Sequence, residues 1–221
     1  MELWKDWGFT WSFTWCGVGT HSLEKIPADV EELIKWIGHC MALIGGVLAT
    51  GDAPGCDTFF WIGYEQGRKE SSYTLPPAQI YYTRKKNQRN STHSPKLGYH
   101  ELEMYPDTAH IAADIAYEAR GSFEGLFPSG IALHTRNAFQ VLSEDLLHPR
   151  KFTVLFAKPV GKQGKCAGGT NTANMISRKN KIPVVNLWIE EERTKFIEWV
   201  KRQLTIRNLP IPPLGATDGQ A

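Results

Sequence analysis

Apolar residues recur at helical spacing along much of the chain. Over 27–44 they fall three or four positions apart and acidic residues fill the first turn, the apolar positions being Val30, Leu33, Ile34, Ile37, Met41 and Ile44. We also predict helices over 56–66, 107–120, 135–147 and 190–204, the last of which opens on three glutamates. Each helix would bury an apolar stripe and leave its polar face in water.

Short apolar runs between these helices are typical of buried strands. They occupy 47–50, 152–157 and 183–187, and 79–83 is a further candidate. Near the N-terminus three aromatic residues alternate with polar ones, which predicts a strand with one aromatic face: Trp11, Phe13 and Trp15. Strands that alternate with helices predict an α/β fold, Rossmann-like and three-layered, with a mostly parallel central sheet flanked by helices.

Three glycine-rich turns follow predicted strands or open predicted helices. Open parallel sheets bind ligands at the carboxyl ends of their strands, and the unpaired N–H groups of a first helical turn attract anions. We therefore expect the turns to form one nucleotide-type pocket. Its candidate residues, two of them from the helix over 135–147, are Gly17, Gly19, Thr20, His21, Gly51, Asp52, Ala53, Gly55, Asp57, Arg136, Asn137, Gly168, Gly169, Thr170, Asn171 and Thr172.

Two carboxylates and an arginine–asparagine pair are the main chemical candidates. Asp52 or Asp57 could bind ribose hydroxyls, or act as a general base if burial raised its pKa, whereas Asp57 could equally cap the helix that follows it. Arg136 and Asn137, at the start of a predicted helix, could supply a phosphate fork and a base or ribose hydrogen bond. A purely structural ion pair of Arg136 is the alternative. We interpret His134 as structural, since a lone histidine most often is.

Length and composition indicate one soluble domain. The 221 residues suit a single domain over 1–206, with an insertion over about 68–106 and a flexible tail over 207–221 that is rich in proline and glycine. No apolar run is long enough to cross a membrane, and 1–11 lacks the features of a secretory signal. We expect a cytoplasmic protein without a membrane partner.

Cysteine spacing, charge and aromatic residues bear on metals and partners. The four cysteines show no CxxC spacing, which predicts buried thiols and no metal site: Cys16, Cys40, Cys56 and Cys166. A net charge of +2 disfavours nucleic-acid binding, and we interpret the basic run over 84–89 as a solvated loop, with a phosphate or nucleic-acid contact as the alternative. The tryptophan-rich N-terminus predicts core packing or a subunit interface, so a homo-oligomer is expected.

Together the three turns resemble those of the SLOG superfamily. They read GVGTH over 17–21, TGDAPGCD over 50–57 and GGTNTA over 168–173, and RNAFQVL over 136–142 resembles an additional arginine–asparagine element of some members. The superfamily includes the Lonely-guy phosphoribohydrolases, the DNA-processing protein A family and many proteins of bacteria and their phages. The similarity covers about 12–66 and 150–204. It implies a Rossmann-like fold that holds a nucleotide-type ligand in the pocket described above, with no cofactor.

Two departures from the superfamily pattern change the expected activity. The Lonely-guy enzymes carry a catalytic glutamate in the third turn, where this chain has Met175, and a thioether cannot accept a proton. His21 stands where an arginine is common, which removes a bidentate phosphate contact. We therefore expect binding of a nucleotide or nucleotide-derived small molecule, for sensing or sequestration. The alternatives are a nucleoside 5′-monophosphate N-glycosidase or phosphoribohydrolase that uses Asp52 or Asp57, and single-stranded DNA binding.

Overall fold

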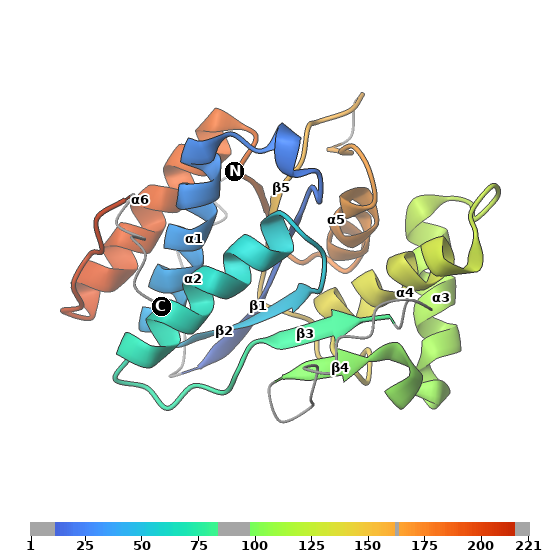
Figure 1. Ribbon diagram of the computed structural model, residues 1–221, viewed down its shortest axis with the longest axis horizontal. Coiled ribbons are helices and arrows are strands. Elements are labelled where there is room, and N and C mark those ends of the chain that lie inside the picture. Colours follow the sequence, from blue (N-terminus) through green and yellow to red (C-terminus); the bar gives the residue numbers. More distant parts are fainter. Residues whose placement is uncertain (1–11, 84–97, 162–163, 215–221) are drawn as a thin grey trace.

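The computed structural model describes residues 12–83, 98–161 and 164–214. They form three layers, a central sheet with a layer of helices on each face (Figure 1). Within these residues all strand pairs are parallel, and the strands run in the order β4-β3-β2-β1-β5-β6. Their bounds are β1 Phe13–Gly19, β2 Gly46–Gly51, β3 Gln79–Tyr82, β4 Tyr99–Glu101, β5 Thr153–Phe156 and β6 Val184–Asn186. The α/β fold predicted from the sequence is confirmed.

Helices cover both faces of the sheet and enclose two hydrophobic clusters (Figure 1). One face is covered by α1 (Ala28–Leu43), α2 (Cys56–Glu70) and α6 (Glu190–Ile206). The other is covered by α3 (Pro106–Arg120), α4 (Pro128–Leu142) and α5 (Thr170–Lys179). The parallel sheet is therefore buried on both sides, as such sheets require.

The alternation along β1 divides its side chains between the two clusters. Phe13 and Trp15 enter the cluster under α1, α2 and α6, and Cys16 and Val18 enter the other. The ring of Trp15 stacks on that of Phe152, with 6.2 Å between centroids. The aromatic face predicted for this strand is confirmed for these described residues, whereas Trp4, Trp7 and Trp11 lie outside them.

Glycines allow α1 and α2 to approach each other closely. A Cβ atom on Gly63 of α2 would overlap the carbonyl oxygen of Lys35 in α1, and one on Gly67 would overlap that of His39. From the other side, a Cβ on Gly38 of α1 would overlap the carbonyl oxygen of Phe60. The two helices thus pack backbone against backbone, which positions the N-terminal end of α2 beside the sheet.

Helix α4 differs from the prediction of a helix over 135–147. It begins at Pro128 and ends at Leu142, where Ser143 has a φ of 73°. Proline lacks an N–H group and has a preset φ, so it suits the first turn of a helix. The helix start was missed because the sequence Pro-Ser-Gly is also typical of a turn. Arg136 and Asn137 therefore lie beyond the middle of α4 and not at its beginning.

The expected insertion over 68–106 contributes to the sheet itself. It contains β3, which was predicted, and β4, which was not, because a three-residue strand carries almost no periodic signal. β4 pairs with β3 through Ile80 opposite Tyr99. The basic run over 84–89 lies outside the described residues.

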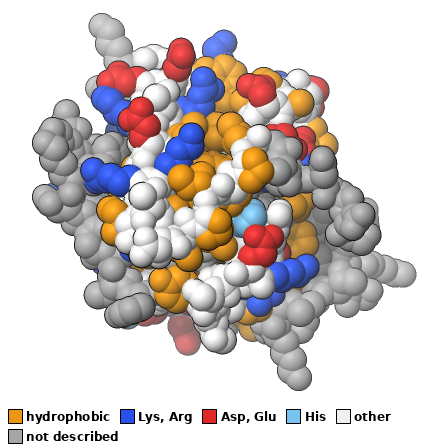
Figure 2. Space-filling model, turned by 90° about the vertical axis from the view of Figure 1, so that its left-hand side faces the viewer, with side chains coloured by type: hydrophobic (Ala, Val, Ile, Leu, Met, Phe, Trp, Pro, Cys, Tyr) orange, Lys and Arg blue, Asp and Glu red, His pale blue; other side chains and the backbone are white. Residues whose placement is uncertain are grey.

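The tail expected to be flexible from Arg207 lies against α1 and α6 as far as residue 214. Trp36 of α1 donates a hydrogen bond from Nε1 to the carbonyl oxygen of Pro212, at 2.8 Å. A cavity of about 240 Å³ lies between the tail and the helices, and apolar side chains gather on this face of the molecule (Figure 2). Proline-rich chain can pack here because its missing N–H groups leave few donors to satisfy. Residues 215–221 lie outside the described part.

All four cysteines are buried as free thiols, as predicted. Burial raises the pKa of Cys16 to about 12 and that of Cys166 to about 11, so these thiols stay protonated at neutral pH. In the described part of the chain, no helix has the length and apolar character to cross a membrane, and no three His, Cys, Asp or Glu side chains gather as metal ligands would. Of the N-terminal tryptophans the structure describes Trp15, which is buried, whereas Trp188 elsewhere in the chain is 40% exposed, and the homo-oligomer stays a prediction.

Candidate functional site

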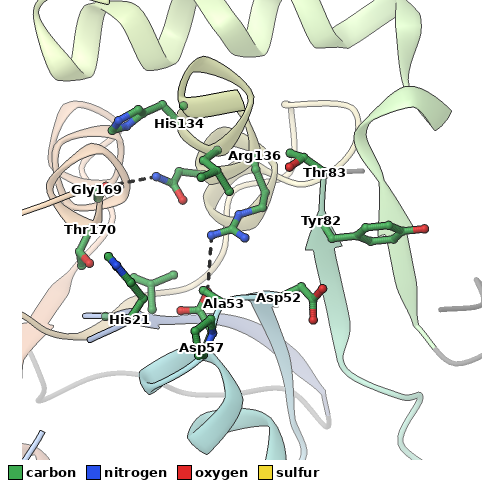
Figure 3. Close-up of a pocket in the computed structure, with 16 residues that line it drawn as sticks. His21, Asp52, Ala53, Asp57, Tyr82, Thr83, His134, Arg136, Gly169 and Thr170 are labelled. Atoms are coloured by element: carbon green, nitrogen blue, oxygen red, sulfur yellow. Dashed lines mark hydrogen bonds and ion pairs between the residues drawn. The ribbon is translucent and has the colours of Figure 1, made fainter. Parts of the chain in front are cut away.

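A pocket of about 320 Å³ lies at the carboxyl edge of the sheet (Figure 3). It is bounded by the chain that follows β1, β2 and β3, by one face of α4 and by the start of α5. This volume is at the lower end of the range for small-molecule sites. The lining residues are Val18, Gly19, His21, Asp52, Ala53, Pro54, Asp57, Tyr82, Thr83, Gly130, Leu133, His134, Arg136, Asn137, Gly169 and Thr170.

The structure brings all three glycine turns and the arginine–asparagine pair to this one pocket. Parallel strands end at the same edge of a sheet, so segments far apart in the sequence meet there. The predicted residues found on the lining are Gly19, His21, Asp52, Ala53, Asp57, Arg136, Asn137, Gly169 and Thr170. The predicted residues that lie outside the lining are Gly17, Thr20, Gly51, Gly55, Gly168, Asn171 and Thr172.

Several predicted glycines are required for packing or backbone conformation. A Cβ atom on Gly17 would lie 2.9 Å from the ring of Phe60, so this glycine makes room for α2. Gly55 and Gly168 have φ values of 81° and 73°, in the left-handed region that glycine tolerates best. These positions shape the turns without touching the pocket.

Polar residues beside these glycines hold the turns together. The carbonyl oxygen of Thr20 accepts the N–H of Cys56, at 3.2 Å, which ties the first turn to the start of α2. In the third turn Asn171 accepts the N–H of Cys166 through its Oδ1, at 3.0 Å. Thr20 and Asn171 therefore act as supports of the pocket.

An ion pair between Asp57 and Arg136 lies at the floor of the pocket (Figure 3). Arg136 Nη2 is 3.6 Å from Asp57 Oδ2, and the two side chains are 10% and 4% exposed. Burial raises the pKa of Asp57 to about 6, against the lowering effects of the Arg136 guanidinium and of hydrogen bonds from the backbone of Ala53 and Gly19. Asp57 thus titrates closer to neutral pH than an ordinary carboxyl group.

The possibility that Asp57 caps α2 is not realised. The N-cap residue is Gly55, and no side-chain hydrogen bond caps this helix. Because Gly55 occupies the cap, Asp57 falls in the first helical turn, and its carboxylate faces Arg136. Its place therefore agrees with the functional alternative and with the structural ion pair of Arg136.

Buried polar atoms of Arg136 and of the neighbouring Gln140 lack hydrogen-bond partners in the described part of the chain. Within the described residues neither Arg136 Nε nor either side-chain polar atom of Gln140 has a hydrogen-bond partner, and all of these atoms are buried. A buried polar group without a partner costs about 1–3 kcal/mol. Such groups are rare in folded proteins, and each calls for a structural or functional explanation.

Hydrogen bonds from α4 fix the first turn of α5. His134 Nδ1 is 2.7 Å from Thr172 Oγ1, and Asn137 Nδ2 donates to the carbonyl oxygen of Gly169 at 3.2 Å. Burial lowers the pKa of His134, and the nearby Arg120 and Arg136 lower it further, so the ring is neutral at pH 7. The structural role expected for His134 is present, but the ring also lines the pocket.

Sequence reasoning missed seven lining residues, most of them at the end of β3 and on α4. Tyr82 ends the third strand and Thr83 follows it, so the rule that ligands bind at carboxyl ends could have found them. The α4 residues share one face at helical spacing, which the mistaken helix start concealed. The missed residues are Val18, Pro54, Tyr82, Thr83, Gly130, Leu133 and His134.

The fold and the pocket define an α/β protein with a small-molecule-sized site at the carboxyl edge of a parallel sheet. Comparison of the chain with protein-family models, with curated proteins and with solved structures finds no match. The function is therefore argued from the site itself.

Proposed function

We propose that the pocket binds a nucleotide or a nucleotide-derived small molecule through an anionic group. The observation that carries the proposal is the Arg136 guanidinium, which is nine-tenths buried and lines the pocket with Nε unpaired among the described residues. Opposite it, Gly169 and Thr170 line the pocket at the N-terminal end of α5. A guanidinium and a helix N-terminus that share a cavity suit a phosphate or a similar anion.

A second group in the pocket suits a ribose. Asp52 also lines the cavity, and its carboxylate points away from Arg136 toward the end of β3 (Figure 3). Carboxylates near dinucleotide pockets bind ribose hydroxyls, because both oxygens accept hydrogen bonds. Phosphate at Arg136 and ribose at Asp52 would orient the base toward the mouth of the cavity. The SLOG-like order of the turns agrees with this class of ligand and with a role in sensing or sequestering a nucleotide signal.

Titration with AMP and 2′-deoxy-AMP tests this assignment. We expect AMP to raise the melting temperature of the protein, since a ligand that binds only the folded state stabilises it. Asp52→Asn should weaken AMP binding by about tenfold and 2′-deoxy-AMP binding much less, because only the ribonucleotide offers the 2′-hydroxyl to the carboxylate. Thermal shift and calorimetric titration measure both effects, and ADP-ribose and cyclic dinucleotides extend the comparison. No stabilisation by any of these compounds at saturating concentration would contradict the proposal.

A hydrolytic role is the second candidate, and the environment of Asp57 favours it. A carboxyl group with its pKa raised to about 6 can accept a proton near neutral pH, as a general base must. If the protein cleaves N-glycosidic bonds, free base should form from AMP, and Asp57→Asn should lower the rate at least 100-fold. Chromatography of the products measures this rate. Asp52→Asn, measured at saturating AMP because it should weaken AMP binding, is the matched control, and equal turnover in the wild type and the Asp57 variant would exclude the mechanism.

A further inference from the structure

Three polar side chains converge on one spot beneath the pocket, at the end of β2. A Cβ atom on Gly51 would lie 2.7 Å from Cζ of Arg136 and would overlap both Oδ2 of Asp57 and Nε2 of Gln140. Gly51 therefore makes space for this cluster, which explains why a glycine stands there although it does not line the pocket. The buried ion pair and the buried amide lie next to each other.

The ion pair in this cluster is longer than a good charge-assisted hydrogen bond. Such bonds measure about 2.7–2.9 Å between nitrogen and oxygen, whereas 3.6 Å separates Arg136 Nη2 from Asp57 Oδ2. Two buried charges at this distance compensate each other only in part for the loss of water. This agrees with the raised pKa of Asp57, for which burial is the largest cause.

Arg136 is the only lysine or arginine among the described residues that line the pocket. The Asp52 carboxylate raises the pKa of Asp57 further, and the imidazoles of His21 and His134 lie on the same lining. The thiols of Cys16 in β1 and Cys56 in α2 have raised pKa values and stay neutral. At the start of α5 the lining residues are the N-cap Gly169 and Thr170, which do not titrate. Within the described part of the lining, an anion on the floor of the pocket therefore has one guanidinium to bind.

We propose that Asp57 is the pocket's own counter-anion, which the anionic group of a ligand replaces beside Arg136 while Asp57 takes up one proton from water. The inference rests on the proposed binding of an anion at Arg136. Two anions beside one buried guanidinium repel each other strongly, and protonation of Asp57 removes that repulsion. One O–H bond forms on Asp57 while the bond that held the same proton in hydronium or in the acid form of the buffer breaks, and no other covalent bond changes. The neutral carboxyl group gains a donor, and the Gln140 amide, which lies in the same cluster through its Nε2, also carries an oxygen without a partner among the described residues.

This coupling makes Asp57 a determinant of specificity. At pH values above about 6 the ligand must supply enough interaction energy to draw in a proton, and below that pH the proton is already bound. Affinity for an anion should therefore fall as pH rises through the pKa of Asp57. If only the protonated form binds, the affinity at pH 7.5 is about 30-fold lower than at pH 5.0.

Sulfate is the probe that tests this coupling, because it does not change its own charge between pH 5.0 and pH 7.5. We expect calorimetric titration of the wild-type protein to show about 30-fold weaker sulfate binding at pH 7.5. Titrations at neutral pH in two buffers of different ionisation enthalpy should show uptake of about one proton per sulfate. Asp57→Asn, a neutral replacement of the same shape, should bind sulfate more tightly than the wild type at pH 7.5 and show no step near pH 6.

Asp52→Asn provides the matched control, since Asp52 is a carboxylate on the same lining that points away from Arg136 (Figure 3). It should retain the pH step, displaced to lower pH because the Asp52 carboxylate raises the pKa of Asp57. Sulfate binding without proton uptake, or a pH step in sulfate affinity that persists in the Asp57 variant, would overturn the coupling. Either result would still be consistent with an anion site at Arg136. No sulfate binding at either pH would contradict the anion site as well. If Asp57→Asn fails to fold, the number of protons that the wild-type protein takes up per sulfate tests the coupling by itself: uptake of about one proton supports it, and no uptake contradicts it.

Discussion

Replacement of Gly63 by alanine should destabilise the fold by about 3 kcal/mol or more. The added methyl group would overlap the backbone oxygen of Lys35, and a backbone atom cannot rotate away as a side chain can. Helices α1 and α2 must then separate, and overpacking of this kind costs about 1–3 kcal/mol where the neighbours are flexible. Because α2 carries Asp57, the floor of the pocket should shift too. Equilibrium unfolding in urea measures the loss.

Gly130→Ala is the matched control for this substitution. A Cβ atom on Gly130, in the first turns of α4, meets only the side chain of Leu126, at 3.6 Å, which is an ordinary contact. Alanine also favours a helix over glycine by up to about 1 kcal/mol, so this variant should be as stable as the wild type or slightly more stable. A Gly63 variant within about 0.5 kcal/mol of the wild type would show that α1 and α2 are less closely packed than described.

Arg136→Met should weaken the binding of AMP and of sulfate by at least 100-fold. It removes the only lysine or arginine on the described lining, and hydrogen bonds to a charged group are each worth about 1.5–3 kcal/mol. It also leaves Asp57 buried without its partner, so the pKa of Asp57 should rise further. The loss of folding free energy, about 3 kcal/mol at pH 7.5, should shrink at pH 5.0, where Asp57 is protonated.

Ligand titration and urea unfolding at both pH values check these two effects. Arg136→Lys serves as the control, because it keeps the charge and loses the planar fork. It should retain most of the stability and lose only part of the affinity. An Arg136→Met protein that binds sulfate as tightly as the wild type would place the anion elsewhere and contradict the proposed function.

The general plan of the fold followed from the sequence because its signals are local. The apolar spacing over 27–44 and the runs at 47–50 and 152–157 each correspond to an observed element. Local signals failed where an element was very short, as at β4, or where its first residues resemble a turn, as at Pro128. Because the start of α4 was predicted too late in the sequence, Arg136 and Asn137 were expected at the beginning of a helix, whereas they lie near its middle.

The pocket was predicted at the correct edge, but the roles of its glycines were not resolved. A glycine that lets a ligand approach and a glycine that makes room for a side chain are identical in a sequence. Gly17 faces the ring of Phe60, and Gly51 faces the cluster around Arg136, so both belong to packing. These contacts join residues from different elements, and no local pattern records them. The ion pair of Asp57 with Arg136 was foreseen only as an unspecified carboxylate partner.

The central position of β1 governs the order in which this chain can fold. Cys16 pairs with Ala49 of β2 on one side and with Thr153 of β5 on the other. The first pairing joins neighbours in sequence, whereas the second must wait until the last third of the chain is available, and such distant pairings slow folding. Until then one edge of an apolar strand stays open to other chains. Gly169 and Thr170 follow β5, so we expect the pocket to be among the last features to assemble and a ligand that spans it to bind chains whose folding is complete.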